Sequence, residues 1–314
     1  MKIAIVGAGA MGSILGAHFI LGGAKVYFID PFEAHIKAMQ ENGLKIRINQ
    51  EEPRNLKVTA VTSADQITEK MDLILFMVKG LYTASAAESA RKLADEKTYC
   101  MTLQNGVGNA EILAEYYNRQ RILAGIVEFG GRIEEPGSVS ALINPAAKIA
   151  FASTTEEEPD EFMQETADTL VRAGLKAFAM KKSQIDAIIW FKLAKNCSGN
   201  PICAVTRLPL GPYNNTEEGL PIEKAVFEEV EAVANAQGIK LADQGAPHKI
   251  PKESQMYYHL PSTAQDVKAK KKTEIDFING AVVRLGERYG VPTPYNHMIA
   301  ALVKIIEQNY DNQF

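Results

Sequence analysis

The first half of the chain alternates between short apolar runs and amphipathic segments. The apolar runs cover residues 3–6, 26–29, 71–78, 99–103, 122–127 and 148–152. Apolar residues are continuous in most of these runs, which predicts strands buried on both faces, as in a parallel sheet covered by helices. Right-handed crossovers between such strands produce an open, doubly wound sheet. Glu134-Glu135-Pro136-Gly137 predicts a hairpin turn between the last two runs.

The pattern changes near Ser183. From there the apolar residues recur at helical spacing, and strand signals largely vanish. We therefore predict an α/β fold in two domains: a Rossmann-like domain over residues 1–182 and an all-helical domain over residues 183–314. Pro201 is expected to bend or end the first helix of the second domain. The predicted helices cover residues 185–198, 222–237, 265–289 and 294–310.

Composition narrows the range of functions. A chain of 314 residues with a net charge of −4 allows two domains and has no general attraction to nucleic acid or to an anionic membrane. No apolar run approaches the roughly 18 residues that a membrane span needs, and the chain starts at a predicted strand with no signal peptide in front of it. The three cysteines lack metal-ligand spacing, so we expect buried apolar residues, no metal and a cytoplasmic location (Cys100, Cys197, Cys203).

The first predicted strand runs directly into a G-x-G-x-x-G turn and then into a helical pattern. In a dinucleotide-binding turn the first glycine permits the tight bend, and the second lets the pyrophosphate approach bare backbone. The third glycine lets helix pack on strand, and the helix N-terminus faces the phosphates. A purely structural glycine turn is the alternative, but the strand, the helix and a later acid favour dinucleotide binding. The turn consists of Gly7, Ala8, Gly9, Ala10, Met11 and Gly12.

The acid that follows the second strand bears on the choice of dinucleotide. Asp30 lies 23 residues after Gly7, where a carboxylate can accept hydrogen bonds from both ribose hydroxyls and repel a 2′-phosphate. Pro31 follows, where an NADP-binding enzyme would favour arginine. Both residues favour NAD over NADP. NADP remains the alternative, because Lys79, after the third strand, could reach a 2′-phosphate. The alternative for Asp30 itself is that it serves only as a helix or turn cap.

Three polar residues lie on one stripe of the first predicted helix of the second domain. Lys192, Asn196 and Asn200 stand at i, i+4 and i+8, within about 80° of one another. Such a stripe is a poor core pattern, and it presents a cation and two amides to a small polar ligand. Glu274 lies on the long later helix predicted for residues 265–289. By itself this acid would be interpreted as exposed to solvent.

These motifs together resemble the ketopantoate reductases (2-dehydropantoate 2-reductases), and the resemblance covers essentially the whole chain. The motifs are Gly7–Gly12, Val78-Lys79, Gln104-Asn105-Gly106-Val107-Gly108, Lys192–Pro201, Gln265-Asp266 and Thr273–Gly280. The resemblance implies reduction of ketopantoate to pantoate with NADPH, in pantothenate and coenzyme A synthesis. It also implies that the substrate lies in the cleft between the domains.

Individual roles follow from the same resemblance. Lys192 matches the family's catalytic lysine and would act as general acid, and Glu274 matches its essential acid. Asn105 matches the asparagine beside the nicotinamide. Asn196 and Asn200 match the substrate-side amides, and Ser262 matches a serine that binds the substrate carboxylate.

Two positions depart from the family pattern. Asp30-Pro31 replaces the usual arginine after the second strand, and His259 replaces a substrate-contacting asparagine, unless it is only a surface loop residue. An NAD-dependent D-2-hydroxyacid dehydrogenase acting on another branched or aromatic 2-oxo acid is therefore the alternative. A non-catalytic nucleotide sensor is a remote one. On a straight helix Ser262 and Glu274 would lie about 18 Å apart, so we expect Ser262 before the helix or Glu274 on the cofactor side. For assembly we consider a homodimer through the helical half.

Overall fold

The computed structural model describes residues 1–242, 249–254 and 256–313, and the chain forms two compact units. The first unit comprises Met1–Gln104 and Asn109–Ile185, and the second comprises Asn105–Gly108 and the residues from Asp186 onward. The predicted boundary after residue 182 differs from this division by three residues at α6. The prediction also places the short loop 105–108 in the first domain, whereas this loop packs with the helical unit.

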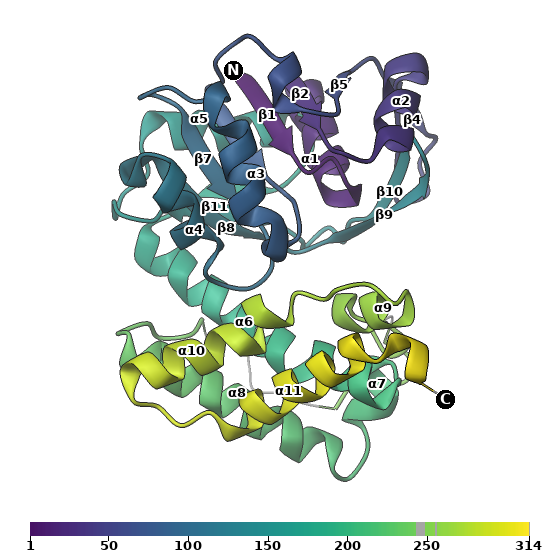
Figure 1. The fold of residues 1–314 in the computed structure, drawn as a ribbon, viewed down its shortest axis with the longest axis vertical. Helices are drawn as coiled ribbons and strands as arrows, with labels where there is room; N and C mark the ends of the chain where they lie inside the picture. The colour runs from purple at the N-terminus through teal and green to yellow at the C-terminus, as the bar shows by residue number, and fades with distance from the viewer. Residues whose placement is uncertain (243–248, 255, 314) are drawn as a thin grey trace. The chain divides into compact units, whose positions relative to one another are not determined.

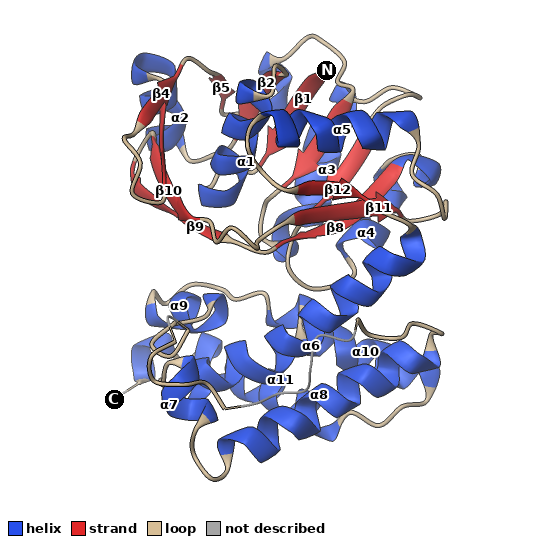
Figure 2. Cartoon of the chain, turned by 180° about the vertical axis from the view of Figure 1, so that it is seen from behind, coloured by secondary structure: helices blue, strands red, loops and turns tan. Residues whose placement is uncertain are grey.

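The first unit contains an eight-stranded sheet in the order β12-β11-β8-β7-β6-β1-β2-β5 (Figures 1 and 2). Neighbouring strands are parallel except for β8 and β11, which are antiparallel. The chain leaves β1 toward β2 and later returns to β6 on the other side of β1, which makes this a doubly wound sheet, as predicted. The strands are β1 (Lys2–Val6), β2 (Lys25–Ile29), β5 (Thr59–Val61), β6 (Leu73–Phe76), β7 (Tyr99–Thr102), β8 (Ile122–Val127), β11 (Ile149–Ser153) and β12 (Ala177–Ala179).

Helices cover both faces of this sheet (Figures 1 and 2). Ile3 and Ile5 of β1 belong to the apolar cluster that includes α1 and α5, and Ala4 and Val6 belong to the cluster that includes α3 and α4. Burial on both faces explains why apolar residues are continuous in the strands, and it confirms the predicted parallel sheet. The helices are α1 (Ala10–Leu21), α2 (Glu33–Asn42), α3 (Thr83–Ala90), α4 (Asn109–Tyr116) and α5 (Glu161–Arg172), with 3-10 turns η1 (Ala64–Gln66), η2 (Gly80–Tyr82), η3 (Arg91–Leu93) and η4 (Arg119–Arg121).

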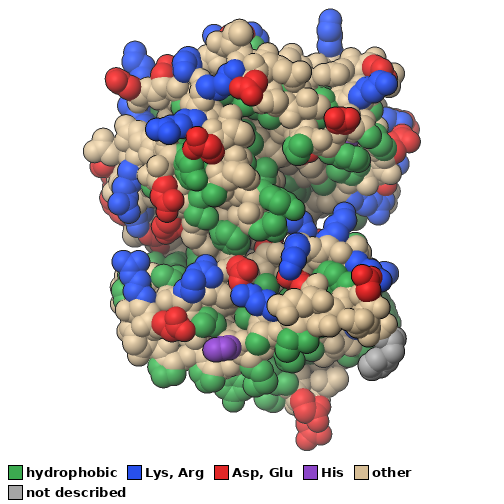
Figure 3. Space-filling view, viewed as in Figure 1, with side chains coloured by type: hydrophobic (Ala, Val, Ile, Leu, Met, Phe, Trp, Pro, Cys, Tyr) green, Lys and Arg blue, Asp and Glu red, His purple; other side chains and the backbone are tan. Residues whose placement is uncertain are grey.

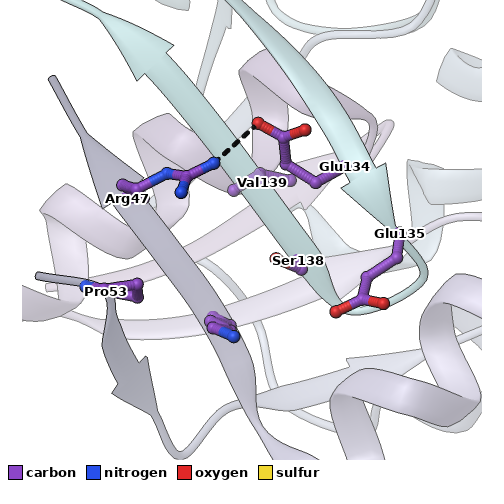
Figure 4. A pocket seen from close by; sticks show the side chains of 7 residues that line it. Arg47, Pro53, Glu134, Glu135, Ser138 and Val139 are labelled. Carbon is purple, nitrogen blue, oxygen red and sulfur yellow. Dashed lines mark hydrogen bonds and ion pairs between the residues drawn. The ribbon is translucent and has the colours of Figure 1, made fainter. Parts of the chain in front are cut away.

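A second, four-stranded sheet was not predicted. Its order is β4 (Arg54–Leu56), β3 (Leu44–Ile48), β10 (Ser138–Leu142) and β9 (Gly130–Glu135). β9 and β10 form the predicted hairpin, and Gly137 takes a φ of +77° in its turn. A pocket of about 160 Å³ lies on this sheet, where Arg47 and Glu134 pair at 3.2 Å (Figure 4).

The second unit is helical, as predicted. It contains α6 (Lys182–Thr206) from Asp186 onward, α7 (Leu210–Asn214), α8 (Gly219–Ala236), α9 (Ser262–Lys268), α10 (Asn279–Tyr289) and α11 (Pro294–Gln308), with 3-10 turns η5 (Ile275–Phe277) and η6 (Tyr310–Asn312). Its core is built from α6, α8, α10 and α11, with Leu193, Val230 and Val282 almost fully buried.

One helix prediction was wrong, and one of two alternatives for a second helix is excluded. Residues 265–289 do not form one helix: α9 ends at Lys268, and Lys270 takes a left-handed φ of +52° before η5 and α10 begin. Glu274 therefore lies between helices rather than on one. Pro201 does not end α6, which continues to Thr206; a bend at Pro201, the other expected effect, stays a prediction.

Cys100, Cys197 and Cys203 are buried and unpaired, which matches their predicted role as small apolar residues. Burial raises the pKa of the Cys203 thiol to about 12 and raises that of Cys197 well above its ordinary value. Within the described ranges, no helix combines the length and the apolar character needed to cross a bilayer.

Candidate functional site

The glycine turn joins β1 to α1 at the carboxyl edge of the main sheet. Gly7 takes a φ of +97°, and its N–H donates to Ile29 O of β2 at 2.9 Å. A Cβ built on Gly7 would lie 2.5 Å from the backbone nitrogen of Val78, in the loop after β6. Only glycine fits a left-handed position so close to neighbouring backbone. The turn therefore packs against the loop after β6, at the point where the strand order reverses. Open α/β sheets bind ligands at such a point.

Gly9 and Gly12 serve different purposes. A Cβ on Gly12 would lie 2.0 Å from Gly7 O, so its absence lets α1 approach β1. A Cβ on Gly9 would meet no atom within 4 Å, so the backbone there borders open space. Gly9 is the N-cap of α1, no side chain caps this helix end, and its first turn has no acidic residue. Uncapped N–H groups beside open backbone fit a pyrophosphate.

Gln104 ties two loops together at the same edge of the sheet. Its Nε2 donates to Val78 O at 2.7 Å and to Thr83 Oγ1 at 2.8 Å, and Thr102 Oγ1 donates to its Oε1 at 2.8 Å. The bond to Val78 holds the loop on which Gly7 packs. Gln104 begins the motif Gln104–Gly108, in which the sequence alone predicts no role for it, so the structure adds a residue that supports the glycine turn.

Asp30 directly follows β2 and is half-buried. Its Oδ1 accepts a hydrogen bond from Phe32 N–H at 2.9 Å, so this side chain does act as a local cap. One acceptor oxygen engaged in this way leaves capacity for a ribose hydroxyl, because a carboxylate accepts about four hydrogen bonds. Lys79 is half-buried and is the N-cap of η2, in the loop after β6.

A buried histidine supports the glycine turn from behind. His35 of α2 is fully buried, and its Nδ1 accepts a hydrogen bond from Gly137 N–H at 3.0 Å. Its Nε2 therefore carries the proton and donates to Ser13 Oγ at 3.2 Å, and Ser13 Oγ donates to Ala8 O at 2.8 Å. Burial lowers the pKa of His35 from 6.5 and keeps the ring neutral. No pattern in the sequence predicts this network, because its members are far apart in the chain.

The polar stripe on α6 is present in the helical unit. Lys192, Asn196 and Asn200 are each half-buried, whereas Leu193 and Cys197, on the other side of the helix, are buried in the core. Asn200 Nδ2 donates to Asn196 Oδ1 at 3.4 Å, so the two amides are adjacent. The stripe therefore lies at the border of the core, where its polar side chains can contact a ligand.

Glu274 and the loop 105–108 meet at η5 in the same unit. Glu274 is half-buried and is the N-cap of η5, and its backbone carbonyl accepts from Phe277 N at 2.9 Å. Phe277 O in turn accepts a hydrogen bond from Val107 N–H at 3.0 Å. Gly106 takes a φ of +82°, and a Cβ there would lie 2.0 Å from Phe277 O. Asn105 is thus held on a loop anchored three residues beyond Glu274.

The remaining two predicted residues lie on the surface of the helical unit. Ser262 is exposed at the first position of α9, directly after Pro261. His259 is exposed in the preceding loop, and its carbonyl accepts from Leu210 N–H at 3.1 Å. The Leu210 side chain lies 3.1 Å from the Cβ position of Gly199, next to Asn200. The His259 loop is therefore joined through α7 to the Asn200 end of the stripe.

Two family models together cover most of the chain. Residues 3–153 match the family described as ketopantoate reductase PanE/ApbA, and residues 184–307 match its C-terminal counterpart.

Individual relatives agree with these models. The chain is 31% identical to a 2-dehydropantoate 2-reductase from Streptococcus pyogenes serotype M6, over 96% of this chain and 97% of that protein. It is 32% identical to a 2-dehydropantoate 2-reductase from Pyrococcus horikoshii, over 98% of each chain.

Solved structures show the same overall similarity. A PanE/ApbA family ketopantoate reductase from Ralstonia eutropha aligns with a TM-score of 0.87 at 31% identity, over 99% of this chain and 100% of that one. A ternary complex of D-mandelate dehydrogenase with NADH and anilino(oxo)acetate also aligns with a TM-score of 0.87, at 26% identity over 99% and 100% of the two chains.

Proposed function

The chain belongs to the ketopantoate reductase family, and from this premise we propose that it reduces the keto group of a 2-oxo acid by hydride transfer from a nicotinamide coenzyme. The observation that carries the proposal is the construction of the helical unit. It presents Lys192 and two amides on one stripe of α6, and it holds Asn105 and Glu274 together at η5. We propose 2-dehydropantoate as the substrate, since relatives with that activity in their names match nearly the whole chain.

We assign coenzyme binding to residues 1–182. The uncapped N-terminus of α1 and the open backbone at Gly9 suit the pyrophosphate, and Asp30 suits the adenosine ribose. Asn105 would contact the nicotinamide end. A reduced nicotinamide coenzyme supplies the hydride when bound. We favour NAD because Asp30-Pro31 offers a 2′-phosphate a negative charge and no arginine, with NADP as the alternative through Lys79.

Residues 183–314 would bind and activate the keto acid. As hydride adds to the keto carbon, negative charge develops on the keto oxygen. The Lys192 ammonium stabilises that charge and donates the proton that completes the hydroxyl group. Asn196 and Asn200 orient the substrate by hydrogen bonds, Ser262 binds its carboxylate, and His259 is a further substrate-binding residue. Glu274 either positions Lys192 or holds the coenzyme ribose.

A second candidate function has an observation of its own. D-mandelate dehydrogenase, which aligns over 99% of this chain, is described in a ternary structure with NADH and anilino(oxo)acetate. Together with Asp30-Pro31 and His259, this similarity favours an NAD-dependent D-2-hydroxyacid dehydrogenase for another branched or aromatic 2-oxo acid.

The three cysteines bear on the location of the protein. Because their thiols are free and buried, we also propose a reducing, cytoplasmic location.

A coenzyme and substrate panel tests the proposal. The purified protein is mixed with NADH or NADPH and with 2-dehydropantoate, 2-oxoisovalerate or phenylglyoxylate, and loss of absorbance of the reduced nicotinamide is followed. Turnover of 2-dehydropantoate with the highest kcat/KM supports the first candidate. Turnover only with NADH and a different 2-oxo acid supports the second. Coenzyme binding without oxidation by any acid would indicate a nucleotide sensor instead.

A further inference from the structure

α6 contains a backbone defect next to its polar stripe. Pro201 lies inside the helix and has no N–H, so Cys197 O, four residues earlier, lacks its usual helical donor. Cys197 is fully buried, so water cannot take the place of that donor. Nevertheless α6 continues for five residues beyond Pro201.

A side chain from another helix supplies the missing donor. Asn279, at the first position of α10, is fully buried, and its Nδ2 donates to Cys197 O at 3.2 Å. The same Nδ2 donates to Asn296 Oδ1 of α11 at 2.9 Å. Among the described residues, Asn279 Oδ1 is a buried side-chain atom with no hydrogen-bond partner. The amide therefore acts through its donor group alone, and one donor group serves two helices.

The orientation of Asn279 is determined by a further layer of hydrogen bonds. Asn296 is fully buried, and its Nδ2 donates to Glu229 Oε2 of α8 at 2.8 Å and to Val226 O at 3.3 Å. These bonds require Asn296 Oδ1 to face Asn279, and they determine which end of the Asn279 amide reaches Cys197. A chain of polar groups thus runs from the Glu229 carboxylate to the carbonyl that Pro201 leaves without a donor.

That carbonyl belongs to the turn of α6 that carries the two asparagines of the polar stripe. Cys197 directly follows Asn196 and precedes Asn200 by three residues, and the two asparagines bond to each other at 3.4 Å. We propose that Asn279 is a positioning residue: by donating to Cys197 O it maintains the turn of α6 that carries Asn196 and Asn200 in register for the substrate. This inference rests on the proposed function, because Asn196 and Asn200 are substrate-side residues only there.

A double-mutant cycle isolates this role. Asn279→Ala is compared with wild type, and the same change is then made in a Pro201→Ala background, where residue 201 regains an N–H for Cys197 O. In the wild-type background we expect KM for the 2-oxo acid to rise about 10-fold, with KM for the nicotinamide coenzyme unchanged. In the Pro201→Ala background the rise should shrink to about 2-fold, because the backbone supplies the donor. Equal rises in both backgrounds would overturn the proposal, as would parallel rises in both KM values.

Unfolding by urea provides a second measurement that does not depend on turnover. The two substitutions should be coupled, with Asn279→Ala destabilising the Pro201→Ala protein less than the wild type; additive effects count against the proposed hydrogen bond. If the Asn279→Ala protein folds only when Pro201→Ala is also present, that result supports the hydrogen bond directly. In that case Asn279→Ser, whose side chain is too short to reach Cys197 O, replaces Asn279→Ala in the kinetic comparison. A wild-type protein that turns over no 2-oxo acid overturns the proposed function, and the unfolding cycle distinguishes that failure from a missing bond.

Discussion

Lys192 and Lys195 lie three residues apart on α6 but in different environments. Lys192 is half-buried on the polar stripe, whereas Lys195 is exposed, with its Nζ 5.8 Å from the centre of the Phe191 ring. We predict that Lys192→Ala lowers kcat by at least ~10²-fold, because the proton donor for the keto oxygen is lost. Affinity for the nicotinamide coenzyme, measured by fluorescence titration, should stay within about 2-fold. Lys195→Ala is the matched control and should retain wild-type kcat; an active Lys192→Ala enzyme excludes this lysine from the chemistry.

Asp30 has two separable properties, its charge and its role as a cap. Asp30→Asn keeps an acceptor for Phe32 N–H and removes the charge that opposes a 2′-phosphate. We expect it to raise kcat/KM for NADPH relative to NADH, and Asp30→Ala with Pro31→Arg to shift the ratio further, because arginine binds phosphate. Steady-state kinetics with both coenzymes measure this ratio. A ratio that does not move would show that Asp30 lies away from the ribose.

His35 links the stability of the first unit to pH. Its pKa lies below 6.5 in the folded chain, chiefly because it is buried, although the nearby Asp30 charge opposes the shift. Below pH 6.5 the unfolded chain binds a proton that the folded chain does not, so the free energy of unfolding decreases by up to about 1.4 kcal/mol per pH unit for this group.

His35→Asn keeps an acceptor for Gly137 N–H and does not titrate. We therefore expect it to reduce the loss of stability below pH 6.5, as measured by urea unfolding on both sides of that pH. His18, whose pKa burial also lowers, remains in the variant and should preserve part of the effect. The same pH dependence with and without His35 would contradict a neutral ring in the folded chain.

At the scale of elements, η5 is the place where prediction and structure differ most. Residues 265–289 have helical periodicity, yet the chain breaks the helix between Lys268 and Asn279. Two side chains of α11 bind the segment between α9 and α10: Glu307 accepts from Thr273 N–H at 2.6 Å, and Lys304 pairs with Asp276 at 2.5 Å. These partners are about 30 residues away in sequence, so local pattern could not reveal them.

The loop 105–108 depends on η5, and Gly106 tests that dependence. A side chain at Gly106 would combine a φ of +82° with a Cβ 2.0 Å from Phe277 O. We predict that Gly106→Ala displaces Asn105, costs about 1–3 kcal/mol of stability and lowers kcat/KM at least ~10-fold. Gly130→Ala is the control, since a Cβ there meets no atom within 4 Å. Wild-type kinetics and stability in Gly106→Ala would mean that this loop does not need its present conformation.

At the scale of the whole molecule, α11 carries an exposed apolar row. Tyr295, Met298, Leu302 and Ile305 are 45%, 56%, 39% and 56% exposed, at spacings of three and four residues. Hydrophobic side chains gather between charged ones on the face of the helical unit that carries α11 (Figures 1 and 3). Rows with this spacing pack against a second helix in coiled coils.

We therefore expect a homodimer through α11. Sedimentation velocity at several concentrations should show a dimer for the wild type and a monomer for Leu302→Glu with Ile305→Glu. Val171→Glu, which changes an exposed apolar residue of α5, serves as the control and should remain dimeric. Monomeric wild-type protein at high concentration would refute this assembly.

Local sequence patterns were enough to predict the α/β and helical halves, the glycine turn, the hairpin turn at Gly137 and the stripe of Lys192, Asn196 and Asn200. All of these depend on residues close together in the chain, where periodicity, backbone freedom and helical spacing act locally.

Contacts between distant segments determine how α6 continues past Pro201, where the helix after Ser262 breaks, and which groups support the glycine turn. Asn279 reaches Cys197 across 82 residues, and Gly137 reaches His35 across 102. A buried carbonyl or N–H must find a partner wherever the fold provides one. That requirement follows from the sequence, but the identity of the partner follows from packing between distant segments.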